Sequence, residues 1–342
     1  MKKLAIIGGT GLLGHHTAML AIEQGFDVTS ISIDDVDIEE DFKKKVHIKV
    51  LDVFKASEEE IKEALKGFDY MIYSVGPDDR VTPKAPAAPF FHQHLVEDCA
   101  KVFRAARDAG VKKSVVYNSY FAYFDREMPE LKLAERHPYV RARVEQARKL
   151  NEEKGKMEVV VLELPYIFGT VHGREPLWKG VFLDRFIKGK KMIFFPNGKT
   201  TMTTVKHIAE SGVGAILYGK DGMRYPIGDE NKSYHYMLDT MLDELYKGTG
   251  KKPHKVHNAP RCFIVMGGKA VMKSELKKGL EPGLDFGYVM KDIMTHDVVV
   301  PEKVLDEVAK ELHLTRGGLD EAIRETVRAC YPNGSFFVND KK

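Results

Sequence analysis

The chain has few cysteines and no apolar run long enough to cross a membrane. Its 342 residues include only Cys99, Cys262 and Cys330, which lie far apart and form no C-x-x-C pair. Disulfide frameworks and zinc cages need paired or closely spaced cysteines, so both are excluded, and an odd, scattered set indicates a reducing compartment. A membrane-spanning helix needs about 20 apolar residues, and the apolar run before Gly8 is also too short for a signal peptide. We therefore expect a cytoplasmic protein with no metal site and no membrane partner.

A strong charge of one sign is also missing. The chain has 53 Lys and Arg against 50 Asp and Glu, a formal net charge of +3. The densest basic runs, Lys43–Lys45 and Lys188–Lys191, are short and are typical of solvated loops or helix ends. We therefore expect no nucleic-acid partner. Internal repeats and low-complexity segments are absent too, and with 43% hydrophobic residues the composition is that of an ordinary globular protein.

A glycine-rich segment near the start is the most informative part of the sequence. The apolar run Leu4–Ile7 is followed by G-G-T-G-L-L-G and then by an amphipathic segment, His15–Gln24. This order predicts a strand, a tight turn and a helix whose N-terminus faces phosphates. We interpret the turn as a dinucleotide-binding site, the alternative being a glycine-rich turn without a ligand. Its candidate cofactor-binding residues are Gly8, Thr10, Gly11, Leu12, Leu13 and Gly14.

Strand-like and helix-like segments alternate through the first half of the chain. The predicted strands are 3–8, 27–33, 47–50, 70–74, 114–118 and 159–163, and the predicted helices are 15–24, 58–66, 90–109 and 139–154. Buried parallel strands read as continuous apolar runs, as these do. The alternation predicts an α/β fold with a doubly wound parallel sheet of the Rossmann type.

The pattern loosens after Pro165. Residues 166–200 are typical of loops and short helices, and later helices are predicted at 206–218, 234–247, 302–312 and 319–330, with strands at 224–227 and 298–300. We expect a cofactor-binding domain over 1–165, with 200–222 returning to it. Residues 166–199 and 223–342 would mainly form a smaller, discontinuous substrate-binding lobe, with 166–200 and 250–295 supplying most of the pocket.

Several motifs, in this order and spacing, resemble the extended short-chain dehydrogenase/reductase superfamily of the NAD(P)-dependent epimerase/dehydratase type. Besides the glycine turn they are L-D-V at 51–53, S-V-G at 74–76, V-V-Y-N-S at 115–119, P-Y-I-F-G at 165–169 and M-T-T-V-K-H-I-A at 202–209, where His207 replaces an Asp. The resemblance implies that the cofactor is contacted by Asp52, Val53, Ser74, Val75, Gly76, Pro165 and Ile167.

The active-site signature of that superfamily is Tyr-x-x-x-Lys, and here Tyr139 is followed by Arg143 instead. The resemblance implies that Ser119, Tyr139 and Arg143 are catalytic and that the last two also contact the cofactor. A cation one helical turn away favours the phenolate and lowers the pKa of a tyrosine, and arginine can supply that charge but cannot relay a proton. The alternative is that Tyr139 and Arg143 are ordinary helix residues and that Ser119 is a strand-end serine that caps the next turn.

The resemblance also implies a substrate site bordered by Tyr120, His172 and Arg174. The cofactor is NAD or NADP: Asp34 and Asp35, beside the second strand, favour NAD, whereas Ser32 stands where a carboxylate is usual. A homodimer is implied through helices 90–109 and 139–150. The apolar stripe Leu95, Cys99, Val102 and Ala106 fits that interface or the face packed on the sheet.

The activity so implied is that of an NAD(P)-dependent oxidoreductase or epimerase/dehydratase. It would transfer a hydride at a carbinol or carbonyl carbon of a hydroxylated metabolite, with a nucleotide sugar as the leading class. The alternative is a non-catalytic NAD(P)-binding regulator that senses redox state. Loss of the signature lysine favours the regulator, and retention of Ser119 and Tyr139 favours the enzyme.

Overall fold

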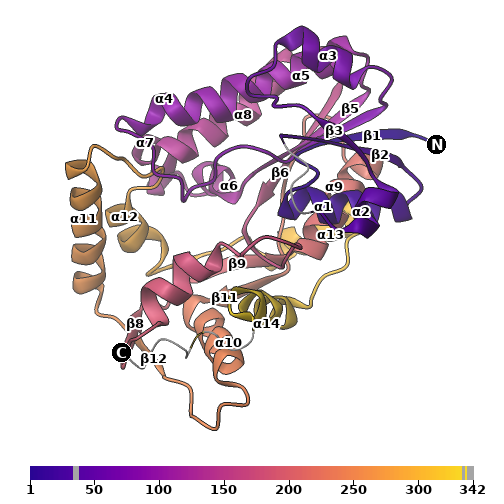
Figure 1. Ribbon diagram of the computed structural model, residues 1–342. Helices are drawn as coiled ribbons and strands as arrows, with labels where there is room; N and C mark the ends of the chain where they lie inside the picture. The colour runs from indigo at the N-terminus through magenta and orange to yellow at the C-terminus, as the bar shows by residue number, and fades with distance from the viewer. Residues whose placement is uncertain (34–37, 333–335, 337–342) are drawn as a thin grey trace.

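A seven-stranded parallel sheet forms the centre of the molecule. Our computed structural model describes residues 1–33, 38–332 and 336 (Figure 1). The strand order is β10-β6-β5-β4-β1-β2-β3, and every pairing in this sheet is parallel. The strands are β1 (Lys3–Ile7), β2 (Asp27–Ser32), β3 (His47–Val50), β4 (Tyr70–Tyr73), β5 (Lys113–Ser119), β6 (Glu158–Leu164) and β10 (Arg224–Pro226). The order reverses between β1 and β4, and the crevice at such a switch point is where ligands bind in open α/β sheets.

Helices cover both faces of the sheet. One layer contains α1 (Leu12–Glu23), α9 (Val205–Tyr218) and α13 (Glu302–Leu312), and the other contains α3 (Glu58–Leu65), α5 (Asp98–Asp108) and α8 (Pro138–Glu153). Along β1, Leu4 and Ile6 pack in one core while Ala5 and Ile7 pack in the other. Burial on both faces explains why this strand reads as a continuous apolar run. A short helix, α2 (Glu40–Lys45), precedes β3.

The predicted helix over 90–109 consists of three successive helical segments. They are α4 (Ala87–Phe91), the π-helical η1 (His92–Glu97) and α5. The stripe Leu95, Cys99, Val102 and Ala106 is fully buried within the chain, and its last three members pack in the core beneath the sheet. The sequence left two positions for this stripe, a dimer interface or the face packed on the sheet, and the structure places it on the sheet.

A second group of elements lies beside the carboxyl ends of the strands. A small sheet has β9 (Lys199–Thr204) paired with β11 (Glu230–Ser233), β13 (Asp297–Val298) and β7 (Tyr166–Phe168), and β8 (Ile193–Phe195) pairs with β12 (Val256–Asn258). Helices α10 (Tyr234–Tyr246) and α14 (Leu319–Cys330) pack together below it (Figure 1). Between β5 and α8 the chain forms α6 (Tyr120–Glu127), η2 (Pro129–Leu131) and α7 (Leu133–Arg136).

The expectation of loops and short helices over 166–200 is wrong in part, because three strands occur there besides η3 (Lys179–Ile187). The threonine-rich β9 reads as polar, yet its residues after Lys199 are buried. Their hydroxyl groups are satisfied by distant partners: Thr201 donates to Asn231 Oδ1 at 2.8 Å and Thr203 to Asp229 Oδ2 at 3.0 Å. Helices α13 and α14 have the predicted bounds. Strand β10 joins the main sheet and α13 packs on α9, although both lie in 223–342.

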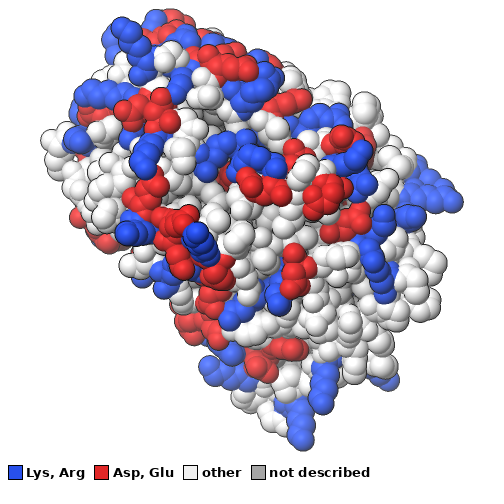
Figure 2. All heavy atoms as spheres, turned by 180° about the vertical axis from the view of Figure 1, so that it is seen from behind, with Lys and Arg blue, Asp and Glu red and all other residues white. Residues whose placement is uncertain are grey.

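An arm stands at the side of the molecule, formed by α11 (Arg261–Lys277), α12 (Phe286–Tyr288) and η4 (Val289–Ile293) (Figure 1). Within the described part of the chain, no helix combines the length and apolarity needed to span a bilayer. On the face in Figure 2, acidic and basic side chains are interspersed over most of the surface.

Candidate active site

The turn between β1 and α1 is shaped by close contacts that only glycine permits. Gly8 has φ +84°, and a Cβ there would lie 2.3 Å from Val75 Cγ1. A Cβ on Gly14 would lie 2.2 Å from the Gly8 carbonyl oxygen, so this residue lets the helix approach the strand. Gly11 caps α1, whose first turn contains no acidic residue. The turn therefore presents the positive end of a helix dipole to the crevice, as a phosphate-binding turn requires.

Two adjoining cavities meet at this turn and share Gly11, Ser74, Val75 and Gly76. The first, of about 550 Å³, is also lined by Gly8, Thr10, Ser32, Asp52, Val53 and Arg174. The second, of about 330 Å³, is also lined by Leu12, Leu13, Ser119, Tyr139, Arg143, Pro165 and Ile167. The first can hold the adenosine half of a dinucleotide and the second its nicotinamide half. Gly14 lines neither and contributes through helix packing.

Ser119, Tyr139 and Arg143 come together in the second cavity. Ser119 ends β5 and caps α6, where its Oγ accepts from Phe121 N at 3.3 Å. Tyr139 lies in the first turn of α8, directly after Pro138, and Arg143 follows one turn later. Arg143 Nε donates to the Tyr139 hydroxyl oxygen at 3.1 Å. The sequence spacing thus translates into a compact group of three side chains.

Arg143 is held by groups besides Tyr139. Its Nη1 donates to the Tyr117 carbonyl at 3.2 Å and to Gln146 Oε1 at 3.0 Å. Asn118 Nδ2 donates to the Arg143 carbonyl at 3.0 Å and to the same Gln146 oxygen at 2.9 Å. The guanidinium is buried, with 7% of the residue exposed. It is therefore a fixed positive charge rather than a mobile surface group.

The environment of Tyr139 both raises and lowers the pKa of its phenol. Burial is the largest influence and raises the pKa, and the nearby Asp79 raises it too. The charge of Arg143 and the hydrogen bonds to Ser119 and Arg143 oppose this rise, and the net pKa stays above its ordinary value of 10. A phenol in this balance responds strongly to any change in the charges that surround it.

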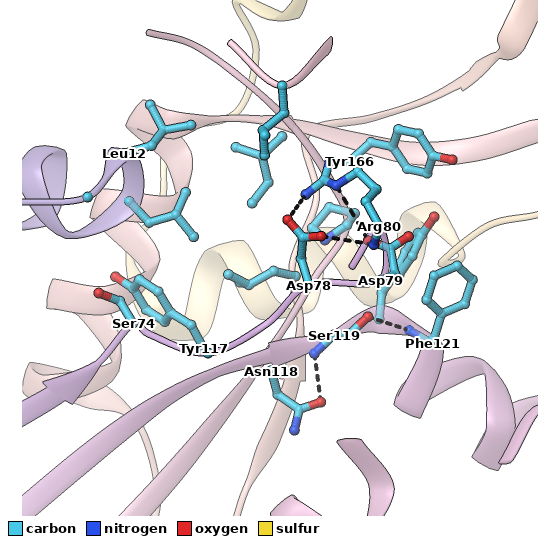
Figure 3. A pocket seen from close by; sticks show the side chains of 18 of the residues that line it. Leu12, Ser74, Asp78, Asp79, Arg80, Tyr117, Asn118, Ser119, Phe121 and Tyr166 are labelled. Carbon is cyan, nitrogen blue, oxygen red and sulfur yellow. Dashed lines mark hydrogen bonds and ion pairs between the residues drawn. The ribbon is translucent and has the colours of Figure 1, made fainter. Parts of the chain in front are cut away.

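Three charged residues that the sequence did not single out line the same cavity. Asp78, Asp79 and Arg80 follow β4 and are grouped near Ser119 at the end of β5 (Figure 3). Arg80 Nη2 lies 2.7 Å from Asp78 Oδ2, and its Nε lies 3.8 Å from Asp79 Oδ1. Burial raises the pKa of Asp79. For Asp78 burial is also the largest single influence, but the hydrogen bonds and charge of Arg80, with the charge of Arg143, together outweigh it and lower the pKa. The available signal was their place directly after S-V-G, at the switch point of the sheet.

Aromatic side chains form the outer wall of this cavity. Tyr166 stacks on Trp178, with ring centroids 5.2 Å apart and planes 7° apart, and Arg80 lies 5.2 Å from the Trp178 ring. Tyr120 lines the cavity as expected, and its hydroxyl lies 3.0 Å from Thr200 Oγ1. Flat aromatic faces next to a guanidinium are suited to a ring-shaped ligand that carries a negative charge.

Other expected substrate contacts lie elsewhere. The segment after Gly169 approaches α1, where His16 Nε2 lies 2.7 Å from the Thr170 carbonyl oxygen. Arg174 consequently lines the first cavity, beside Ser32, and His172 lines neither cavity. Asp34 and Asp35 lie outside the described residues.

The expectation that 250–295 would line the pocket is wrong, because no residue of this segment borders either of the two cavities. It supports the site from behind instead. Tyr139 N donates to the Gly283 carbonyl at 3.1 Å, and Asp285 N donates to His137 Nδ1 at 2.9 Å. The segment therefore fixes the start of α8 and with it the position of Tyr139.

His207 is a buried connector between distant segments. It lies in the first turn of α9, with Nδ1 at 2.9 Å from Asp229 Oδ1 and at 2.8 Å from the Thr315 carbonyl. Asp229 Oδ2 also accepts from Thr204 N at 2.9 Å. Burial is the largest single influence and raises the pKa of Asp229, but the hydrogen bond and charge of His207, with the hydrogen bonds from Gly317 N and Thr204 N, together outweigh it and lower the pKa. His207 is therefore a helix-start residue, and Asp229 supplies a carboxylate beside the position where His207 replaces an Asp.

The comparisons with known proteins agree with this architecture. Residues 8–165 match a family model described as NAD(P)H-binding. Mouse sterol-4-alpha-carboxylate 3-dehydrogenase, decarboxylating, is 22% identical over 273 residues, which cover 75% of this chain and 71% of the mouse protein.

Solved structures share the fold over nearly the whole chain. A nucleoside-diphosphate-sugar epimerase from Pseudomonas aeruginosa superposes with a TM-score of 0.67 at 16% identity, covering 98% of this chain and 99% of that one. UDP-glucose 4-epimerase from Bifidobacterium longum, in complex with NAD+ and UDP, gives 0.66 at 16% identity, with 97% and 100% covered.

Fold and glycine turn together define an α/β protein with an NAD(P)-binding domain. Over residues 8–165 the chain is similar to NAD(P)H-binding proteins, and its whole fold is similar to that of the nucleotide-sugar epimerases.

Proposed function

We propose that this protein is an NAD(P)-dependent oxidoreductase or epimerase/dehydratase that acts at a carbinol or carbonyl carbon of a hydroxylated metabolite. The observation that carries the proposal is the meeting of Ser119, Tyr139 and Arg143 in a cavity that continues from the glycine turn. The dinucleotide, when bound, supplies the hydride acceptor or donor. The residues of the chain orient the substrate and move its proton.

Tyr139 is the proposed proton donor or acceptor. When a substrate hydroxyl is oxidised, the Tyr139 oxygen takes up its proton, and Ser119 holds the same substrate oxygen. Arg143, 3.1 Å from the Tyr139 hydroxyl, stabilises the phenolate that must form first. Because arginine stays protonated, the proton leaves by another route, and Asp79 is the carboxyl group in the cavity whose pKa is raised by burial.

The proposed substrate is a hydroxylated ring compound with an anionic group, and a nucleotide sugar is its leading class. Trp178 and Tyr166 offer flat faces, and Arg80 offers a guanidinium whose partners, Asp78 and Asp79, an incoming anion would replace. Proteins of similar fold include sugar-nucleotide epimerases, and the mouse relative is named for a sterol carboxylate. Both candidate classes carry the hydroxyl group and the anion.

NAD is the proposed cofactor, and Arg174 makes this choice testable. Asp52 and Ser32 line the adenosine side, and a carboxylate there disfavours a 2′-phosphate. Arg174 is the one Lys or Arg among the described residues that line this cavity, and it is the natural partner of a 2′-phosphate. Calorimetric titration with NAD, NADH, NADP and NADPH, on the wild type and on Arg174→Ala, separates the two. An NADP affinity that exceeds that of NAD and falls in the variant would overturn the NAD assignment.

The enzyme is distinguished from a non-catalytic redox sensor by the effect of Tyr139. A panel of nucleotide sugars and hydroxy acids is screened for cofactor reduction and for epimerised product. Turnover that disappears in Tyr139→Phe while cofactor affinity is kept supports the enzyme. If the folded protein binds the cofactor but turns over no substrate class of the panel, the sensor is favoured. The observation that specifically supports a sensor is that Arg143 stands in place of the signature lysine.

A cytoplasmic homodimer completes the proposal. In this superfamily the surfaces of α5 and α8 are the expected interface, although the apolar stripe of α5 is already buried against the sheet. Light scattering of the purified protein measures its mass in solution.

A further inference from the structure

Helix α11 exposes an apolar surface that the other residues described by the structure do not cover. Its buried residues are Gly268 and Met272, whereas Phe263, Met266 and Leu276 are 64%, 56% and 51% exposed. The inner side packs on α12 and η4, where a Cβ on Gly268 would lie 2.4 Å from the Phe286 carbonyl oxygen. The outer side is open and stands apart from the body (Figure 1). Large apolar side chains grouped on a surface mark a site of contact with another body.

The strand pair at the foot of α11 extends this apolar character. Strand β12 leads directly into α11, and its partner β8 is preceded by Met192, which is 59% exposed. Phe194 on β8 is 51% exposed, with its ring 5.6 Å from that of His257. The exposed apolar residues therefore belong to two adjacent elements.

The same region is strongly basic. Residues 247–278 contain nine Lys and Arg and one acidic residue, Glu275, which accepts from Lys278 at 2.8 Å. The whole chain has a net charge of +3, so the remainder of the molecule is net negative. Figure 2 shows basic side chains among uncharged ones along the side of the molecule that α11 forms. Four of these basic residues, Arg261, Lys269, Lys273 and Lys277, lie on α11 against the single acidic Glu275, so the helix with the exposed apolar residues has a net charge of +3.

A groove between α11 and α12 combines both properties. It has a volume of about 750 Å³ and is lined by four lysines, Lys269, Lys273, Lys277 and Lys291, together with the apolar Met272 and Leu276. Its carboxylate, Asp285, is engaged in capping α12, where Oδ1 accepts from Gly287 N at 2.8 Å. Lysines around an apolar floor fit an amphiphile with an anionic head group.

We propose that the outer face of α11 docks on a bilayer that contains anionic phospholipids. Phe263 and Met266 enter the boundary between head groups and acyl chains, and the lysines of the groove contact lipid phosphates. A second copy of this chain fits poorly, because a two-fold contact would bring one lysine-rich face against another. A surface-lying helix with apolar and basic residues binds in this way without crossing the bilayer.

The test is sedimentation of the full-length protein with sucrose-loaded vesicles. One set contains phosphatidylcholine alone and the other phosphatidylcholine mixed with phosphatidylglycerol, each at low and at physiological salt. We expect binding to the anionic vesicles alone, weakened by salt. A lysine near an anionic surface contributes about fivefold to partition, so Lys269→Glu/Lys273→Glu/Lys277→Glu should weaken binding by roughly a hundredfold or more.

Matched variants distinguish the effect of the α11 residues on vesicle binding from the effect of equal changes in charge or polarity elsewhere on the surface. The control for charge is Lys66→Glu/Lys206→Glu/Lys303→Glu, which changes the net charge equally on exposed lysines of other elements. For the apolar contacts, Phe263→Glu/Met266→Glu is compared with Leu217→Glu/Met223→Glu, at exposed positions far from α11 in sequence. Both controls should sediment like the wild type. Circular dichroism melting and cofactor titration establish that each variant is folded.

Three outcomes would overturn the proposal. One is wild-type protein that stays in the supernatant with both vesicle types. Another is sedimentation that the α11 variants and the controls reduce equally. The third is a dimer in light scattering that the α11 variants dissociate, because the face would then be an interface between copies of this chain.

Discussion

The two cavities of the site are built in different ways. The cofactor side is centred on consecutive residues, from Gly8 to Gly14, which Ser32, Asp52, Val75 and Arg174 join from other segments. The substrate side is assembled from the ends of β4, β5 and β6, the start of α8 and the loop that holds Trp178. A short local motif therefore places the dinucleotide, whereas the substrate is met by side chains that only the complete fold brings together. Variants should consequently damage one side without the other.

The largest expected effect lies on the substrate side. Tyr139→Phe removes the proton-transferring oxygen and should lower kcat by about a thousandfold, the size expected for a general acid or base. The cofactor affinity should stay within about twofold, since the glycine turn is untouched. Steady-state kinetics and calorimetry measure the two quantities. Tyr123→Phe, on α6 and outside both cavities, is the matched control and should retain activity.

The reverse damage is expected from Gly14→Ala. The new Cβ would lie 2.2 Å from the Gly8 carbonyl oxygen, so the turn must open. We expect a loss of about 3 kcal/mol in the free energy of unfolding, typical of overpacking, and at least a tenfold weaker cofactor. Denaturant unfolding and calorimetry are the measurements. Gly267→Ala, which meets no atom within 4 Å, should keep both properties, and equal losses in the two variants would contradict the packing argument.

The stability of the protein should fall at acid pH because of His137, which holds the segment behind the substrate side. Burial lowers the pKa of His137 to about 4, with Asp285 opposing the shift. The folded protein therefore takes up this proton later than the unfolded chain, whose histidine titrates near its ordinary value of 6.5. The stability is complete above pH 6.5 and declines between there and pH 4, by about 3 kcal/mol in the free energy of unfolding.

Urea unfolding across that pH range measures the decline. His137→Gln should flatten it, at a cost in stability at neutral pH, because the hydrogen bond from Asp285 N is weakened. His47→Gln alters an exposed histidine and should leave the pH dependence of the wild type unchanged. If the free energy of unfolding of His137→Gln falls with pH as steeply as that of the wild type, groups other than His137 cause the decline.

The smallest expected effect sharpens the electrostatics of the substrate side. The charge of Asp79 raises the pKa of Tyr139, so Asp79→Asn should lower that pKa. In the oxidation direction the ascending limb of the kcat profile should then move to lower pH. Asp79→Glu keeps the charge and should keep the limb in place, and a profile that is the same in all three proteins would remove Asp79 from the vicinity of the phenol.

Much of the fold was predictable because its cues are local. Apolar runs bounded by glycine locate the central strands, and the amphipathic spacing of α13 and α14 gives their bounds without error. The glycine turn follows from residue spacing in the same way, whereas the Tyr139–Arg143 pair was implied by the resemblance to the superfamily signature. Strand β9 was missed because its threonines read as polar until Asp229 and Asn231 satisfy them. Helix α11 was missed because it contains Gly267 and Gly268, which weaken its helical pattern.

The sequence by itself determined the parallel sheet and the phosphate-facing turn, because apolar runs and the glycine spacing are local signals. The catalytic candidates came from the resemblance of its motifs to a known superfamily and stay a prediction. Only the tertiary structure decided that Asp79 and Arg80 share a cavity with Tyr139, and that Arg174 belongs to the adenosine side. It also decided that the charge of the chain is unevenly spread, with a basic, apolar arm that the overall composition conceals. Contacts between distant segments depend on how elements pack, and no spacing along the chain encodes that packing.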